Sequence, residues 1–344
     1  HDADGLRRLS RRNGRSAAAQ VLHSRTQKAR PARILRSCSG KNTAQLSSME
    51  DDVNIQKNQI FTVKITDMGT DGEGIGHLED SDALSGNGYT LFVKDAVLGD
   101  TVRAKVVKPK KGYAFARLEE VLEPSPDRVE PVCAYARQCG GCQLQAVSYE
   151  KQLAFKDRKV KNNLIRIGGF APDFVEEIME APVGMEHPFH YRNKAQFPVG
   201  MDKNGRLIAG FYAGRTHTII ENRDCALGVE ENKIVLDIVL DFCTEKKIPA
   251  YDETTGKGLL RHVLIRKGFS TGQIMVCLIL NGSSFAAEQE LADRLFEKVP
   301  GMTSFSVNSN TERTNVIMGS KTRTIRGKDR IEDTIGGLVF TISP

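Results

Sequence analysis

The sequence contains no apolar run that could cross a membrane, because its longest one, Ile274 to Leu280, is far shorter than the roughly 20 residues that a membrane-spanning helix requires. It also contains no internal repeat, no low-complexity tract and no glycine-rich loop of the phosphate-binding kind. These absences argue against a membrane-spanning protein, a repeat protein and a P-loop enzyme. The 344 residues, 40% of them hydrophobic, are sufficient for two or three domains with substantial cores.

Acidic residues are almost missing from the first 49 positions, which carry 11 lysines and arginines against Asp2 and Asp4 alone. From Glu50 onward, 38 basic residues face 41 acidic ones, so the net charge of +6 comes from the leader. An arginine-rich, acid-poor leader is typical of an organellar transit peptide, whereas Met49 followed by acidic residues is typical of an initiator preceded by unrelated residues. We favour the second interpretation and assign residues 1–48 to a disordered or non-native leader outside the fold. Nucleic-acid binding would then depend on local basic patches.

Cysteine is too sparse and too unevenly placed for a secreted disulfide framework. Cys133, Cys139 and Cys142 are spaced as C-x5-C-x2-C, and Gly140 and Gly141 allow the backbone to wrap closely around an ion or cluster. The spacing predicts a three-thiolate metal site in a reducing cytosol, and therefore a cytoplasmic protein.

Such a site needs a fourth ligand, and Cys225 is the best candidate. Cys38 lies in the leader, while Cys243 and Cys277 lie in apolar periodic segments that are typical of core thiols. Three clustered thiolates and a distant one suit either a structural zinc ion or an iron–sulfur cluster. The residues alone leave both alternatives open.

Short alternating segments broken by glycine and aspartate run from Gln59 to about Leu122 and predict a small β-barrel. One basic stretch in this region stands out because it combines lysines with aromatic residues, the mixture that neutralises phosphates and stacks bases. The alternative is a solvated hairpin tip. The candidate RNA-binding residues of this stretch are Lys108, Lys110, Lys111, Tyr113 and Phe115.

The rest of the chain alternates helix and strand patterns. Ser148 is placed to cap a helix that runs to about Ile167 and stops at Gly168. Strand and helix signals then alternate to the end of the chain, which predicts a mixed α+β domain. The expected domains are a barrel over 57–122, a cysteine nest and helix over 123–181, and a central α+β domain over 182–344.

Six motifs follow one another along the chain: Pro131 to Gln145, His190 to Phe197, Gly210 to Ala213, Arg223 to Cys225, Gly258 to Arg266 and Thr314 to Gly319. Their order resembles that of the RNA (uracil-5-)-methyltransferases, especially the branch that acts on 23S ribosomal RNA. The resemblance covers about residues 57–344. It implies that the barrel is a TRAM domain, an RNA-binding module of the OB type, and that the four cysteines hold a [4Fe-4S] cluster.

The resemblance also implies a central domain that grips folded RNA. Arg192, Lys194, Arg261 and His262 lie in the matching motifs and are predicted to contact phosphates or base edges. The alternative is that the basic residues form the solvated face of a half-buried sheet and that His262 is a satisfied core histidine.

In that family a cysteine thiolate adds to carbon 6 of a flipped-out uracil, carbon 5 takes the methyl group of S-adenosylmethionine, and a carboxylate removes the proton. No residues up to Pro344 match these steps or the Rossmann-like domain that binds S-adenosylmethionine. We therefore expect a chain truncated before that domain, with no catalytic residue and no activity by itself. The predicted fold class is α+β multidomain, with an OB-like barrel, an iron–sulfur nest, a mixed α+β central domain and no Rossmann-like methyltransferase domain.

Two classes of function remain. The first is S-adenosylmethionine-dependent methylation of uridine carbon 5 in 23S ribosomal RNA, which the final alternating strand, Gly337 to Ile342, favours because it has no polar tail. The second is a non-catalytic iron–sulfur or zinc RNA-binding protein, with a transfer RNA uridine-5 methyltransferase as a further alternative. We expect RNA as the partner, no membrane and a monomer.

Overall fold

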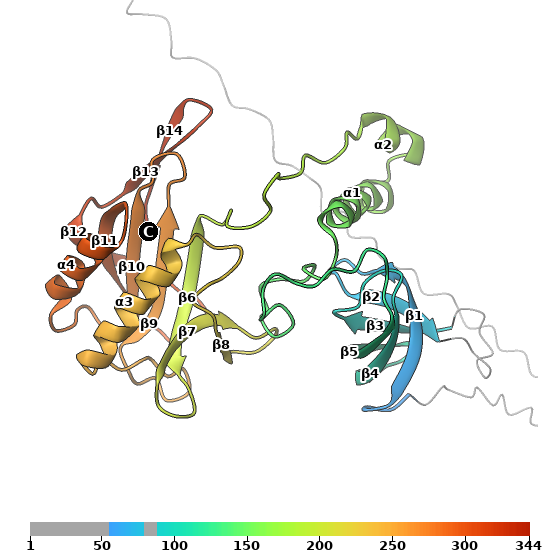
Figure 1. Ribbon diagram of the computed structural model, residues 1–344, viewed down its shortest axis with the longest axis horizontal. Helices are drawn as coiled ribbons and strands as arrows, with labels where there is room; N and C mark the ends of the chain where they lie inside the picture. The colour runs from blue at the N-terminus through green and yellow to red at the C-terminus, as the bar shows by residue number, and fades with distance from the viewer. Residues whose placement is uncertain (1–54, 79–87) are drawn as a thin grey trace, which may run out of the picture. The chain divides into compact units, whose positions relative to one another are not determined.

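The computed structural model describes residues 55–78 and 88–344 (Figure 1). The predicted leader over residues 1–48, with Cys38, lies outside the described residues. Within the described ranges, no helix is both long and apolar enough to pass through a lipid bilayer.

Five strands in the described part of the chain close a barrel in the order β1-β2-β3-β5-β4, with β4 returning to pair with β1. The β3–β5 pair is parallel. On β4, Val102, Ala104 and Val106 are fully buried in the barrel core, because alternate residues of a strand point to opposite faces. The strands are β1 (Ile60–Met68), β2 (Gly74–Leu78), β3 (Tyr89–Lys94), β4 (Thr101–Lys110) and β5 (Tyr113–Glu123).

Strand β2 contains two glycines, Gly74 and Gly76. A Cβ atom on Gly76 would lie 2.5 Å from Val63 Cγ2, and one on Gly74 would lie 2.9 Å from Ile65 Cγ2. Glycine at these positions therefore lets β2 lie closely against β1, with which it pairs.

A buried ion pair fixes the linker that follows β5. Asp100 is fully buried, and its carboxylate accepts hydrogen bonds from Arg128 Nη2 at 2.6 Å and from the Ser125 and Val97 N–H groups at 2.9 and 2.7 Å. Burial by itself would raise the pKa of Asp100, but these hydrogen bonds outweigh it and hold the pKa below its ordinary value. The chain therefore leaves the barrel in a fixed direction.

Two helices come next, α1 (Tyr149–Arg166) and α2 (Pro172–Ile178). Ser148 occupies the N-cap position of α1, as predicted, but its side chain makes no capping hydrogen bond. The helix ends where glycine allows the backbone to turn, with the Gly168 N–H donating to the Asn163 carbonyl at 3.0 Å.

The remaining described residues form a seven-stranded sheet in the order β12-β11-β10-β9-β6-β7-β8, and a separate ribbon of β13 and β14. Strands β10 and β11 run parallel and are joined through α4. The elements are β6 (Lys194–Met201), β7 (Leu207–Tyr212), β8 (Ile219–Glu221), α3 (Glu231–Glu245), β9 (Leu260–Lys267), β10 (Ile274–Leu280), α4 (Glu288–Lys298), β11 (Met302–Ser309), β12 (Lys321–Gly327), β13 (Ile331–Ile335) and β14 (Leu338–Ile342).

Different elements pack against the two faces of this sheet. Val263 of β9 is buried in one core with Leu236 of α3 and Leu291 of α4. The next residue along β9, Leu264, points to the other face and packs near Ile317. Alternate residues of β6 and β9 therefore face a side that the helices leave free.

Candidate functional site

The cysteine nest, residues 133–142, contacts the central domain through its backbone. The Gly140 N–H donates to the Tyr212 carbonyl at 2.9 Å, and Cys139 forms an isolated β-bridge with Ala213. A Cβ atom on Gly140 would lie 3.0 Å from both Gly214 Cα and the Tyr212 oxygen. Glycine therefore permits this close approach.

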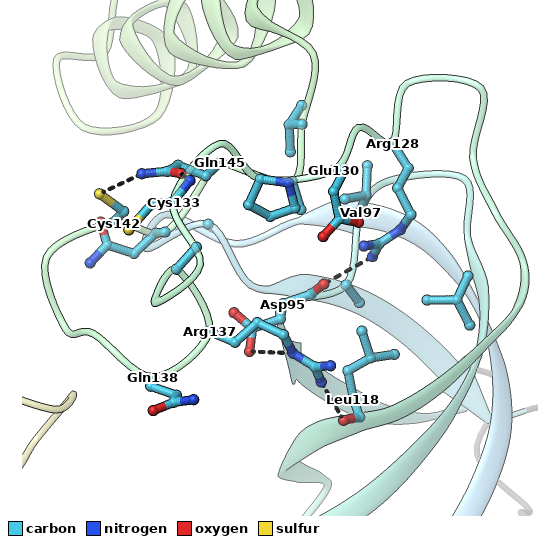
Figure 2. A pocket seen from close by; sticks show the side chains of 18 of the residues that line it. Asp95, Val97, Leu118, Arg128, Glu130, Cys133, Arg137, Gln138, Cys142 and Gln145 are labelled. Carbon is cyan, nitrogen blue, oxygen red and sulfur yellow. Dashed lines mark hydrogen bonds and ion pairs between the residues drawn. The ribbon is translucent and has the colours of Figure 1, made fainter. Parts of the chain in front are cut away.

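The nest also contacts the barrel. Lys94 Nζ donates to the Arg137 carbonyl at 3.0 Å, and Arg137 Nη2 donates to the Leu118 carbonyl at 3.0 Å. Figure 2 shows the hollow of about 290 Å³ at this junction, which Cys133 and Cys142 line. The nest is thus held by hydrogen bonds on both of its sides.

Three of the four predicted cysteine ligands have an N–H group directed at their sulfur. Such donors stabilise a thiolate, the form of cysteine that binds metals. The donor and acceptor pairs are Gln145 Nε2 with Cys142 Sγ at 3.2 Å (Figure 2), the Gly141 N–H with Cys139 Sγ at 3.4 Å, and Asn222 Nδ2 with Cys133 Sγ at 3.9 Å.

The fourth predicted ligand, Cys225, lies close enough to act on the other thiols. Burial raises the pKa of Cys139 and of Cys142, and the charge on Cys225 raises both further, while the Gly141 and Gln145 donors oppose this. Across the described ranges, no group of three or more Cys, His, Asp or Glu side chains is arranged to hold a metal ion. The donor set still fits a thiolate-bound metal centre in kind, because sulfur ligands with N–H donors suit iron–sulfur clusters and zinc.

The two other described cysteines are core thiols, as predicted. Cys243 of α3 is 1% exposed and Cys277 of β10 is 0% exposed. Burial raises the pKa of Cys243 to about 12 and that of Cys277 to about 11, so both stay protonated at neutral pH.

Arg192, Lys194 and His262 line one hollow of about 310 Å³ on the sheet face that α3 and α4 leave free. The β6–β9 register places Lys194 beside Arg266 and Pro198 beside His262. Burial lowers the pKa of Lys194, and the neighbouring Arg266 guanidinium lowers it further. The positive charge of the hollow thus comes from Arg192 and Lys194.

Arg261 lies elsewhere and is 5% exposed. Its Nη1 donates to the carbonyls of Asn310 and Glu312, each at 2.8 Å, and its guanidinium lies 4.5 Å from the centre of the Tyr251 ring. These contacts hold the segment after β11 against β9. They give Arg261 a positioning role and do not present it to a ligand.

His262 makes the stability of the fold sensitive to acid. Burial, and then the charge of Arg261, lowers the pKa of His262 from 6.5 to about 4, so the unfolded chain takes up the proton more readily than the native protein. The stabilisation is complete above about pH 6.5 and is lost as the pH falls toward 4, a difference of about 3 kcal/mol. We expect His262→Gln to remove most of this pH dependence, measured as the difference between the free energies of unfolding in urea at about pH 6.5 and about pH 4. Equal losses in the variant and the parent would contradict this.

The predicted barrel contacts lie at the β4–β5 turn, where the Tyr89 hydroxyl fixes the backbone. This hydroxyl lies 2.7 Å from the Lys110 carbonyl and 2.6 Å from the Tyr113 carbonyl and shares its one hydrogen between them. All of the predicted contacts except the half-buried Phe115 are exposed: Lys108, Lys110, Lys111 and Tyr113.

Phe92 of β3 belongs to the same surface, although it was not a predicted site residue. Its ring centre lies 5.7 Å from those of both Tyr113 and Phe115. The parallel β3–β5 register places Phe92 beside Phe115. The inward alternation of Leu91 and Val93 was a signal that Phe92 points outward, but closure of the barrel is what brings β3 next to β5.

Comparison with known proteins agrees with these features. The family model described as TRAM domain matches residues 55–118. An uncharacterized RNA methyltransferase of Clostridium tetani is 40% identical over 296 residues, covering 86% of this chain and 61% of the relative. One of Halalkalibacterium halodurans is 43% identical over 289 residues, covering 84% of this chain and 60% of the relative. The chain contains a TRAM domain, is related to RNA methyltransferases, and spans about 60% of the length of these relatives.

A solved structure shares the fold. The Pyrococcus abyssi tRNA (uracil-54, C5)-methyltransferase in complex with S-adenosyl-L-homocysteine matches with a TM-score of 0.59 and 22% identity, over 82% of this chain and 59% of that one. At this identity the match describes the fold alone.

This match corrects the predicted fold class, which stated that a Rossmann-like methyltransferase domain is absent from this chain. That prediction is wrong, because the fold of a solved methyltransferase accounts for 82% of the chain. The associated predictions of a truncated and inactive chain are not supported either.

Proposed function

We propose that this protein takes part in S-adenosylmethionine-dependent methylation of uridine carbon 5 in RNA, with 23S ribosomal RNA as the substrate. The described residues contribute RNA recognition, and the protein works in the cytoplasm as a monomer. The observation that carries the proposal is a TRAM barrel whose lysines and aromatic rings gather at one turn, in a chain related to RNA methyltransferases. Lysines neutralise phosphates while exposed rings stack on unpaired bases.

The second RNA contact in this proposal is the hollow on the central sheet. Arg192 and Lys194 supply positive charge there, and His262 is neutral at physiological pH because its pKa is about 4. A neutral imidazole can still donate or accept one hydrogen bond with a base edge. The barrel and this hollow would then bind separate parts of one folded RNA.

We further propose that Cys133, Cys139, Cys142 and Cys225 hold a [4Fe-4S] cluster. When bound, the cluster has a structural role, because four protein ligands leave it no open position for substrate. Gln145, Asn222 and the Gly141 N–H would direct hydrogen bonds at its sulfur ligands. Zinc is the competing metal, and anaerobically purified protein distinguishes the two: a cluster gives broad visible absorption and zinc gives none.

The barrel contact predicts a defined response to charge reversal. Lys110 and Lys111 are exposed beside the aromatic rings, so replacing both by glutamate should weaken RNA binding and lower the slope of log affinity against log salt by about 1 to 2. A filter-binding titration at several salt concentrations measures both quantities. The matched control is Lys203→Glu with Lys298→Glu, which changes the charge equally in the central domain. Identical salt slopes in the two double variants would remove the barrel turn from the site.

Competition between RNAs tests the substrate. A 23S ribosomal RNA segment should displace a bound RNA probe at lower concentration than transfer RNA does. Stronger competition by transfer RNA would favour the transfer RNA alternative. Failure of every RNA to bind would overturn the proposed function.

A further inference from the structure

The barrel carries a hollow of about 450 Å³ beside the β4–β5 turn. One wall consists of three aromatic side chains, those of Phe92, Tyr113 and Phe115. Tyr113 is 36% exposed, its ring meets the other two edge-on, and the ring centres of all three pairs are 5.7 Å apart. Rings held open to solvent in this way provide a surface on which a planar group can stack.

A second part of the lining, here called the acidic wall, is the β1–β2 loop, residues 69–73, which carries Asp71 and Glu73. Within the described ranges, neither carboxylate makes a hydrogen bond or ion pair. Both are therefore free to accept hydrogen bonds from a ligand. Carboxylates would also repel a phosphate placed between them.

This loop is held in place from outside the barrel. Lys159 Nζ of α1 donates to the Thr70 carbonyl at 2.7 Å, and the Gly69 N–H donates to the Glu73 carbonyl at 2.8 Å. Gly72 has φ +88° and is buried, and a Cβ atom there would lie 2.9 Å from Leu144 Cδ2. The acidic wall is therefore preorganised.

The charges around the hollow favour the phosphate and the base of a nucleotide at different places. Lys110 and Lys111 directly precede Gly112, which lines the hollow, and both are exposed, so positive charge lies next to the hollow. Phosphates are attracted to these lysines, and the acidic wall leaves the interior to an uncharged ring that offers hydrogen-bond donors.

We propose that this hollow binds one unpaired RNA base that presents donors along its edge, guanine above all. The inference rests on the proposed RNA function and adds a base preference to it. Guanine places its N1–H and N2–H groups side by side, so one carboxylate can accept both hydrogen bonds. Adenine and cytosine offer one amino group each, and uracil flanks its single N–H with two carbonyl oxygens that a carboxylate repels.

The test uses fluorescence anisotropy with oligouridines that carry one central guanosine, adenosine, cytidine or uridine. The parent protein should bind the guanosine oligonucleotide about tenfold more tightly than oligouridine. The double variant with Asp71→Ala and Glu73→Ala should bind the guanosine oligonucleotide and oligouridine with equal affinity. Phe92→Ala should weaken binding of all four by about tenfold. The control is Glu120→Gln, on an exposed β5 residue paired with Arg103 and outside the hollow, which should change nothing.

The outcomes separate the inference from the proposed function. Equal affinity for all four oligonucleotides overturns the base preference while the RNA-binding function stands. A guanosine preference that survives the double alanine variant overturns the role of the acidic wall. Failure of the parent protein to bind any oligonucleotide or folded RNA overturns the inference and the proposed function together.

Discussion

Replacing Cys225 by alanine is expected to reduce the iron content of anaerobically purified protein from about four atoms per chain to background. Cys225 comes from the loop after β8, while the other three predicted ligands come from the cysteine nest, so its loss leaves a cluster with an incomplete ligand set. Iron and acid-labile sulfide analysis, with visible absorption, measures the effect.

The matched control is Cys243→Ala, which removes a buried core thiol of α3 and should leave the iron content unchanged. Full iron retention by Cys225→Ala would contradict the proposed ligand set. Finding zinc and no iron in the parent protein would show that these cysteines bind a structural zinc ion and not a cluster.

Because the nest contacts both the barrel and the central domain, we also expect Cys225→Ala to increase hydrogen exchange of the segment around Gly140.

Replacing Asp100 by alanine should cost the barrel about 3 to 5 kcal/mol, because it leaves the Arg128 guanidinium without its partner and removes acceptors from two backbone N–H groups. Hydrogen exchange of β4 and β5 peptides, followed by mass spectrometry, reports this loss locally. The control is Glu120→Ala, which breaks the exposed ion pair with Arg103 and should cost less than about 1 kcal/mol. Similar exchange in the two variants would contradict a buried-pair role for Asp100.

The same carboxylate gives the barrel an acid dependence of known sign. Hydrogen bonds hold the pKa of Asp100 below its ordinary value of 3.8, so its stabilisation is complete above that pH and is lost as the pH falls through the lower native pKa. Asp100→Asn cannot titrate and should show less acid destabilisation of β4 and β5 than the parent. This dependence lies below the pH range in which His262 acts, so the two effects can be separated.

Local patterns predicted the barrel strands because the signal lies within each strand. Val102, Ala104 and Val106 alternate with polar residues, and their burial follows from that alternation alone. The same pattern does not explain Gly74 and Gly76, because glycine often signals a turn in sequence but here permits close contact between two strands. The contacts with Val63 and Ile65, which show that these glycines lie in a strand and not in a turn, involve another strand and cannot be read from the glycines and their sequence neighbours.

The sequence indicated the residues of the cysteine site, Cys225 included, but not the contacts that bring them together. The spacing of the nest cysteines singles them out, whereas the approach of Cys225 depends on the contact between Gly140 and Tyr212. Arg261 was predicted to contact RNA, with a solvated strand face as the alternative. Its burial arises from the Asn310 and Glu312 carbonyls, which lie far along the chain.

The most direct test of the proposed function is nucleoside mass spectrometry of 23S ribosomal RNA from cells with and without the gene that encodes this chain. The proposal predicts that deletion removes 5-methyluridine from one position of 23S ribosomal RNA and that the intact gene restores it. Unchanged 5-methyluridine in 23S ribosomal RNA, or its loss from transfer RNA alone, would contradict the proposal.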